Sequence, residues 1–137
     1  MTSLQENRAK AEAYIARRGE TGVMNHINGQ SVPAADGATF QTISPVDLRK
    51  LADVAHGKSA DIDAAVAAAK AAFPAWRDMP GAKRRKILHA VADAIEARAE
   101  EIAFTECMDT GQAIRFMSKA ALRGAENFRF FADKAPE

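Results

Sequence analysis

The spacing of apolar side chains along the chain changes twice, and each change marks a different kind of structure. Near the N-terminus the apolar side chains share one narrow helical face, and Ser3 followed by Glu6 is the pattern of a capping box. Gly19 and Gly22 are expected to end this helix, because glycine commonly follows a helix C-terminus. The apolar face is weak, so residues 1–22 are expected to form a helical arm that lies on another surface.

The next segment, residues 24–57, shows the alternation of apolar and polar residues that is typical of strands. The pair Asn28-Gly29 is the strongest two-residue signal for a β-hairpin, and Asp36-Gly37 indicates a second turn. Ser44-Pro45 ends the strand before it, because proline has no N–H to donate to a neighbouring strand. The segment therefore predicts three short strands joined by tight turns.

Beyond this segment the spacing is helical almost to the end of the chain. Ser59 is expected to cap a helix whose apolar face consists of Ile62, Val66, Ala69 and Phe73. Pro80 is expected to begin the next helix, Gly111 to end the helical segment after it, and a last helix to finish near Asp133. The pattern predicts an α/β chain, in which a short β-hairpin and strand region is followed by an α-helical layer, with an extra helix at the N-terminus.

The composition predicts a core that buries little apolar area. The chain has 137 residues, a length that suits one domain, and 31 of its hydrophobic residues are alanine. Alanine favours helix strongly but buries little area. We therefore expect slender, closely packed helices.

Charge and cysteine content exclude several classes of protein. Nineteen Lys and Arg residues balance eighteen Asp and Glu residues, which argues against nucleic acid as a partner. No stretch approaches the roughly 20 apolar residues of a membrane helix, and the polar N-terminus lacks the apolar run of a signal peptide. A single cysteine cannot form an internal disulfide, which indicates the cytoplasm.

The reactive side chains specify no reaction by themselves. Cys107 has neither a base nor a helix N-terminus beside it in the sequence, which favours an inert, buried thiol over a nucleophile. The three histidines stand too far apart to place two zinc ligands on one helical face, and no glycine-rich phosphate loop is present. The basic run Lys83–Lys86 is better explained as a solvated or partner-facing surface than as a phosphate site. From these residues alone, the chain is a soluble α-rich domain with a small sheet.

The order of short motifs points further. Three strand motifs come first, in His26-Ile27-Asn28-Gly29-Gln30, residues 39–45 and Leu51-Ala52-Asp53-Val54. Helix motifs follow in residues 59–66, 71–76 and 84–88, and then Asp109-Thr110-Gly111-Gln112. In this order and spacing, residues 24–137 resemble the N-terminal part of the aldehyde dehydrogenase superfamily. Ser44 stands where that family has asparagine before proline, and Leu48 where a turn glycine is common; both are variations within a turn.

The N-terminal helix and the run Ala121–Asp133 look most like 5-carboxymethyl-2-hydroxymuconate semialdehyde dehydrogenases, which oxidise a semialdehyde in bacterial aromatic-acid breakdown. The resemblance implies an oxidoreductase that uses NAD or NADP to convert an aldehyde into a carboxylic acid. Such enzymes use a cysteine thiolate, a glutamate base and an asparagine that stabilises the oxyanion, and they bind the dinucleotide on a Rossmann-like sheet. In the family these motifs lie well beyond residue 137, and Cys107 does not occupy the nucleophile's position.

We therefore expect a fragment, with residues 1–22 as the arm and residues 23–137 as a partial cofactor-binding domain truncated before the dinucleotide-binding and catalytic motifs. Alone it is expected to be inactive. Its implied partner is the remainder of the dehydrogenase chain, which is expected to be a homo-oligomer when full length, without nucleic acid or membrane. The resemblance also implies a structural monovalent cation near Thr42, Ile43 and Asp109. The alternative is a small alanine-rich helical interaction module without enzymatic activity.

Overall fold

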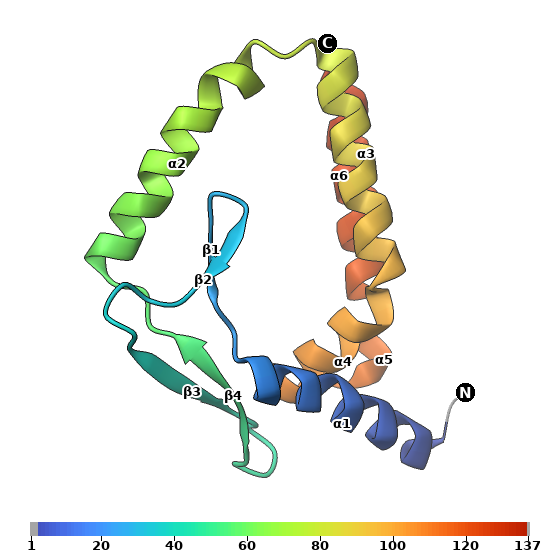
Figure 1. Ribbon diagram of the computed structural model, residues 1–137. Helices are drawn as coiled ribbons and strands as arrows, with labels where there is room; N and C mark the ends of the chain where they lie inside the picture. Colours follow the sequence, from blue (N-terminus) through green and yellow to red (C-terminus); the bar gives the residue numbers. More distant parts are fainter. Residues whose placement is uncertain (1–2, 137) are drawn as a thin grey trace. The chain divides into compact units, whose positions relative to one another are not determined.

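The computed structural model describes residues 3–136, and these form two compact units, one ending at Pro74 and the other beginning at Ala75. Along the described residues the order is one helix, four strands and five helices (Figure 1). An N-terminal helix, two small hairpins and then helices confirm the predicted α/β class.

Helix α1 (Leu4–Thr21) begins with the predicted capping box. The Glu6 N–H donates to Ser3 Oγ at 3.2 Å, and the Ser3 N–H donates to the Glu6 carboxylate at 2.6 Å. The prediction that Gly19 ends the helix is wrong, because α1 continues to Thr21 and ends at Gly22, which has a positive φ of 67°. Gly19 instead lies beside the carbonyl of Leu51, so it marks the contact between α1 and the strand Lys50–Ala55 (β4).

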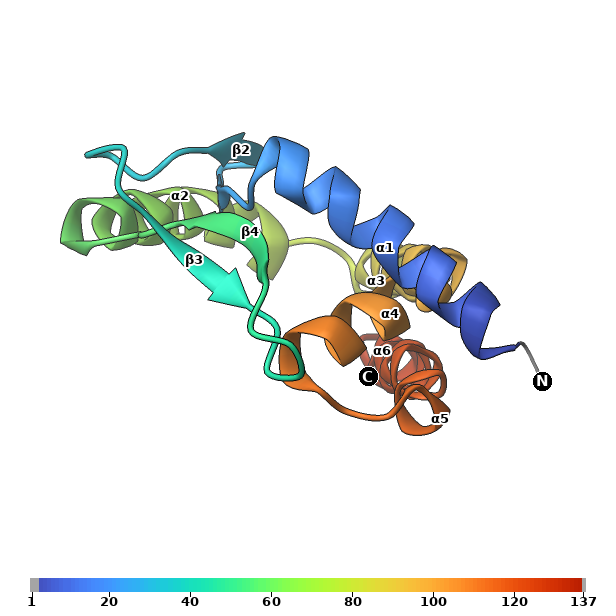
Figure 2. The same cartoon turned by 90° about the horizontal axis from the view of Figure 1, so that it is seen from below.

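The two hairpins of the first unit are separate. Strands β1 (Asn25–Ile27) and β2 (Gln30–Val32) pair antiparallel, and both turn residues between them, Asn28 and Gly29, have positive φ values of 53° and 75°. Two consecutive positive φ values define a type I′ turn, so the predicted Asn-Gly hairpin is confirmed. Strand β3 (Thr39–Ile43) pairs antiparallel with β4 (Figure 2). The prediction of three strands is wrong: the described residues contain four strands in two sheets, because Gln30–Val32 returns along β1 as a strand of its own.

The turn between β3 and β4 contains both departures from the family pattern. Ser44 is fully buried, and its hydroxyl accepts the Val46 N–H at 3.2 Å while its carbonyl accepts the Leu48 N–H at 3.0 Å. Leu48 has a φ of 60°, a conformation that glycine adopts freely and leucine adopts under strain. The serine therefore fixes the turn, and the leucine carries a strain that glycine would not.

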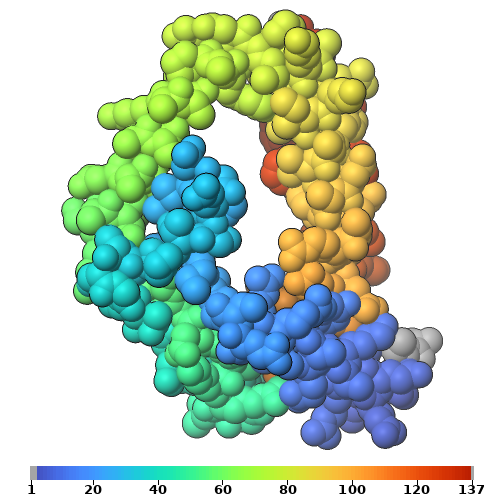
Figure 3. All heavy atoms as spheres, in the orientation of Figure 1, coloured from blue at the N-terminus to red at the C-terminus, as the bar shows by residue number. Residues whose placement is uncertain are grey.

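Helix α2 (Ser59–Arg77) follows β4 and contains Pro74. Ser59 is its first residue rather than the residue before it, and the Lys58 N–H at its start donates to the Asp61 carboxylate at 2.9 Å. The side chain that accepts an N–H at the start of α2 is therefore that of Asp61, and the prediction that Ser59 caps the helix is wrong. Most residues of α2, drawn in green to yellow-green in Figure 3, are exposed.

The second unit consists of helices that pack side by side. They are α3 (Gly81–Ala97), α4 (Ala99–Thr110), α5 (Ile114–Met117) and α6 (Ala120–Lys134). Gly111 has φ 74° and caps α4 as predicted. One last helix was predicted after Gly111, but the structure has two there: the short α5 and then α6. Helices α3 and α6 run antiparallel along each other (Figure 1), with alanines at 0% exposure between them: Ala92, Ala125 and Ala132.

Candidate functional site

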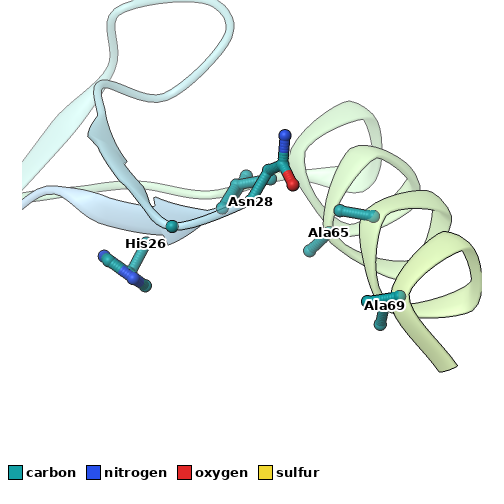
Figure 4. A pocket seen from close by; sticks show the side chains of 8 residues that line it. His26, Asn28, Ala65 and Ala69 are labelled. Carbon is teal, nitrogen blue, oxygen red and sulfur yellow. The ribbon is translucent and has the colours of Figure 1, made fainter. Parts of the chain in front are cut away.

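A groove in the first unit lies between the β1–β2 hairpin and α2. It has a volume of about 340 Å³ and is lined by residues of the hairpin and by alanines of α2: His26, Ile27, Asn28, Gly29, Ala65, Ala68, Ala69 and Ala72. In Figure 4, Ala65 and Ala69 project from α2 towards the hairpin, and the Asn28 amide at the tip of the hairpin points towards the helix, whereas the His26 ring extends away from it. The lining therefore offers a wall of alanines beside one amide, and the one ring of the lining is turned away from that wall.

Asp61 holds the hairpin region to the start of α2. Its carboxylate is buried (7% exposed) and accepts the backbone N–H groups of Ala35 at 2.8 Å and Lys58 at 2.9 Å, with the Asn25 amide at 3.4 Å. A buried carboxylate is stable when several donors surround it. Sequence reasoning placed Asp61 only in the first turn of a helix, because its donors lie up to 36 residues away along the chain.

A second cavity lies within the second unit, among α4, α5 and α6. It has a volume of about 300 Å³ and is lined by Ile102, Ala103, Glu106, Gln112, Met117, Ala120 and Ala121. Glu106 and Gln112 are its polar side chains, and the rest of the lining is apolar. The cavity is thus a gap in an alanine-rich helical layer with two polar groups at its wall.

Cys107 lies one position after Glu106, near the end of α4, and is half-buried. Burial raises the pKa of its thiol, and the neighbouring Glu106 carboxylate raises it further. A thiol with a raised pKa is protonated at neutral pH, and the thiolate is the nucleophilic form. The structure therefore agrees with the interpretation of Cys107 as an unreactive thiol.

The residues expected near a monovalent cation lie in different units. Thr42 and Ile43 are neighbours on β3 of the first unit, where Thr42 is half-buried and Ile43 is exposed. Asp109 lies in the last turn of α4, in the second unit, and is exposed. The cation site stays a prediction.

The basic run Lys83–Lys86 is partly taken up by contacts within the second unit. Arg85 Nε donates to the Asp133 carboxylate at 2.8 Å, and Arg84 donates to the carbonyls of Met79 and Ala135. His89 and then Arg85 hold the pKa of the Asp133 carboxyl below its usual range through hydrogen bonds. These bonds join the start of α3 to the end of α6, so two of the four basic residues stabilise the fold.

Within residues 3–136, no group of three or more His, Cys, Asp or Glu side chains is arranged to hold a metal ion. In the same part of the chain, none of the helices combines the length and the hydropathy that crossing a membrane requires. The polar side chains described above hold backbone segments together, and the buried alanines pack the helices.

Known proteins match the chain closely over part of their length. The model of the aldehyde dehydrogenase family matches residues 32–137. The NADP/NAD-dependent aldehyde dehydrogenase PuuC of Escherichia coli (strain K12) is 42% identical over 110 residues, which cover 78% of this chain and 22% of that protein. The 5-carboxymethyl-2-hydroxymuconate semialdehyde dehydrogenase of Escherichia coli is 40% identical over 112 residues, covering 80% of this chain and 24% of that protein.

The backbone agrees with that of solved relatives. The crystal structure of HpcC from Thermus thermophilus matches with a TM-score of 0.91 at 33% identity, over 94% of this chain and 25% of that one. The chain thus spans about a quarter of the length of the relatives that it matches. Because the two curated relatives are nearly equal in identity, at 42% and 40%, they do not single out one member of the family.

Proposed function

Because the chain belongs to the aldehyde dehydrogenase family, we propose that it is the N-terminal part of an NAD(P)-dependent dehydrogenase that oxidises a semialdehyde to a carboxylic acid. The observation that carries this proposal is the family match over residues 32–137, accompanied by a backbone that follows HpcC with a TM-score of 0.91. The match gives no support to an unrelated helical interaction module, whose alanine-rich pattern would not be expected to reproduce the family's motifs in order.

The proposed substrate is 5-carboxymethyl-2-hydroxymuconate semialdehyde, a product of aromatic-acid breakdown. Support comes from the Escherichia coli dehydrogenase named for that compound, which is 40% identical to this chain. The match to PuuC at 42% supports the wider class of aldehydes equally well. A comparison of substrates in one assay therefore has to decide between them.

The chemistry is proposed to come from the remainder of the full-length enzyme. That remainder would supply the thiolate, the base and the binding of NAD or NADP, while residues 1–22 form an arm and residues 23–137 part of the cofactor-binding domain. The raised pKa of Cys107 supports a thiol that takes no part in the reaction. The full-length enzyme is proposed to be a cytoplasmic homo-oligomer, with a structural monovalent cation near Thr42, Ile43 and Asp109.

The experiment compares the chain alone with a fusion protein. The purified chain, mixed with NAD or NADP and an aldehyde, should produce no reduced cofactor. Fused at Glu137 to the part of PuuC that follows the matched region, it should oxidise aldehydes, with 5-carboxymethyl-2-hydroxymuconate semialdehyde as the test for substrate choice. The matched control is the fusion with Cys107→Ser, which should retain full turnover because this thiol is not the nucleophile.

Two outcomes would contradict the proposal. Turnover by the chain alone would show that it carries its own catalytic groups. A folded fusion protein that oxidises no aldehyde, although PuuC itself does so in the same assay, would show that the chain does not replace a dehydrogenase N-terminus.

A further inference from the structure

The tip of the β1–β2 hairpin brings together two groups that can react with each other. Asn28 and Gly29 occupy the two central positions of the turn, with φ values of 53° and 75°. Both residues are exposed, so the other described residues of the first unit leave them accessible to water. The Asn28 side chain offers an electrophilic carbon, Cγ, and the backbone nitrogen of Gly29 is the nearest nucleophile along the chain. A five-membered ring can therefore form at the turn.

Ring closure requires one particular backbone angle. In the planar ring, Asn28 Cβ and the Gly29 nitrogen must be eclipsed about the Cα–C bond of Asn28. Together with the positive φ of that residue, this gives a ψ of about −120°, the value found at the first central residue of a type II′ turn. The same ψ with a negative φ is sterically forbidden. An asparagine in a helix or a strand must therefore leave its element before it can react.

The hairpin can reach this geometry without coming apart. Type I′ and type II′ turns both join antiparallel strands through two residues, and rotation of the Asn28–Gly29 peptide converts one into the other. Asn28 keeps its positive φ during this rotation, and Gly29 adopts a negative φ as readily as a positive one. The pairing of Ile27 with Gln30 lies outside the rotating peptide, so the strands stay joined.

Independently of the proposed function, we propose that Asn28 is a site of spontaneous deamidation through a succinimide formed with Gly29. The Gly29 nitrogen attacks Cγ of Asn28, and the new N–Cγ bond replaces the Cγ–Nδ2 bond. Ammonia leaves with the proton of the Gly29 amide. Water then opens the ring at one of its two carbonyl carbons, which leaves aspartate or isoaspartate at position 28. Water is the only co-reactant.

Both products change the hairpin and the groove beside it. The Asn28 amide points towards α2, where Ala65 and Ala69 form part of the groove wall (Figure 4). Deamidation replaces this neutral amide by a carboxylate, and a charge beside an apolar wall is unfavourable. Isoaspartate also lengthens the main chain by one carbon, and the length of the loop sets the register of a hairpin. We therefore expect the hairpin to loosen as the modification accumulates.

Incubation of the 137-residue chain at neutral pH in water enriched in heavy oxygen tests the proposal, because ring hydrolysis labels the new carboxylate. Peptide mass spectrometry compares Asn28 with two asparagines in regular structure, Asn25 on β1 and Asn127 on α6. Label should enter at Asn28 at least about tenfold faster, since the other two must also acquire a positive φ. Unfolding in urea should accelerate labelling at Asn25 and Asn127 but not at Asn28.

Two variants separate the chemistry from the turn that supports it. Gly29→Asp keeps a residue type that tolerates a positive φ, but its Cβ crowds the attacking nitrogen, so most of the labelling at Asn28 should be lost. Asn28→Gly keeps the turn and removes the amide. Its hairpin amides should exchange hydrogen at a constant rate throughout the incubation, whereas those of the parent should exchange faster as label accumulates.

Four results would overturn the proposal. They are equal labelling at Asn28 and Asn127, faster labelling of Asn28 in urea than in the folded chain, full labelling of Gly29→Asp with its hairpin amides still protected, and unchanged exchange of the hairpin in a labelled parent. If Gly29→Asp fails to form the hairpin, the comparison of folded and urea-unfolded parent decides, because it uses no variant.

Discussion

Helix α2 of the first unit and the α3–α6 pair of the second are built from similar residues and are stabilised differently. Both are rich in alanine, but between α3 and α6 the alanines Ala92, Ala125 and Ala132 are completely buried. The alanines of α2 are at best half-buried. A small side chain contributes packing only where a second backbone approaches it, so the same composition gives a tight helix pair in one unit and an unfinished surface in the other.

The close approach of α3 and α6 is also visible at their ends. A Cβ atom on Gly81 would lie 2.5 Å from the Ala135 carbonyl oxygen and 2.6 Å from Pro136 Cα, so only glycine fits there without a shift of backbone. In the first unit, by contrast, hydrogen bonds to the Asp61 carboxylate join the hairpin region to α2. The helix pair of the second unit therefore relies on packing along its length, whereas α2 is held to the hairpin region by polar contacts at its start.

The most direct way to break this comparison is to add volume at matched alanines. Ala125→Leu should lower the free energy of unfolding by about 2–3 kcal/mol, because the added atoms have no space between α3 and α6. Ala71→Leu on α2 is the matched control and should change stability by less than about 0.5 kcal/mol, since that position is exposed. Urea unfolding followed by circular dichroism measures both. Equal effects at the two sites would mean that α3 and α6 are not the more closely packed pair.

The second test removes the carboxylate that joins the hairpin region to α2. Asp61→Ala leaves the N–H groups of Ala35 and Lys58 without their acceptor, which should cost about 2 kcal/mol. Asp63→Ala, on the same helix at an exposed position, should cost less than about 0.5 kcal/mol. Amide exchange of the β1–β2 hairpin reports the loss locally, and it should rise in the first variant only. If the two variants behave alike, Asp61 does not anchor the hairpin.

Local rules predicted the parts of the fold that depend on a few neighbouring residues. The Ser3–Glu6 capping box, the Asn28-Gly29 hairpin and the Gly111 cap all follow from side chains within four positions of one another. The return of Gln30–Val32 as a strand and the continuation of α1 through Gly19 could not be predicted in this way. They depend on pairing with β1 and on contact with Leu51, which are tertiary interactions.

The candidate site shows the same division. Sequence alone indicated that Cys107 is unreactive, since no base or helix N-terminus stands beside it, and its raised pKa agrees. The role of Asp61 was missed because its donors come from three separate segments. The exposure of Ile62, Val66 and Phe73 was missed as well, because an apolar spacing identifies one face of a helix without showing whether anything covers it.

The smallest expected effect concerns the charges that cross the α3–α6 pair. Arg129 donates to Glu96 at 2.8 Å and to Asp93 at 2.7 Å, and its hydrogen bonds hold the pKa of the Glu96 carboxyl below its ordinary value of 4.5. A carboxyl with a lowered folded-state pKa stabilises the fold fully above its unfolded value, and the contribution is lost as the pH falls through the folded value. Arg129→Met, which keeps the apolar stem, should therefore lower Tm slightly at neutral pH. The difference from the parent should shrink in acid, as Glu96 becomes protonated and its ion pair with Arg129 is lost.

Arg123→Met is the matched control, because Arg123 is an exposed arginine on the same helix. Its Tm difference from the parent should be close to zero at both pH values, and added salt should reduce the effect of Arg129→Met because exposed ion pairs are screened. If the Tm difference caused by Arg129→Met persists in acid, the ion pairs with Glu96 and Asp93 are not its source. The α3–α6 pair would then be held by apolar packing, and it would differ from α2 in the burial of its alanines.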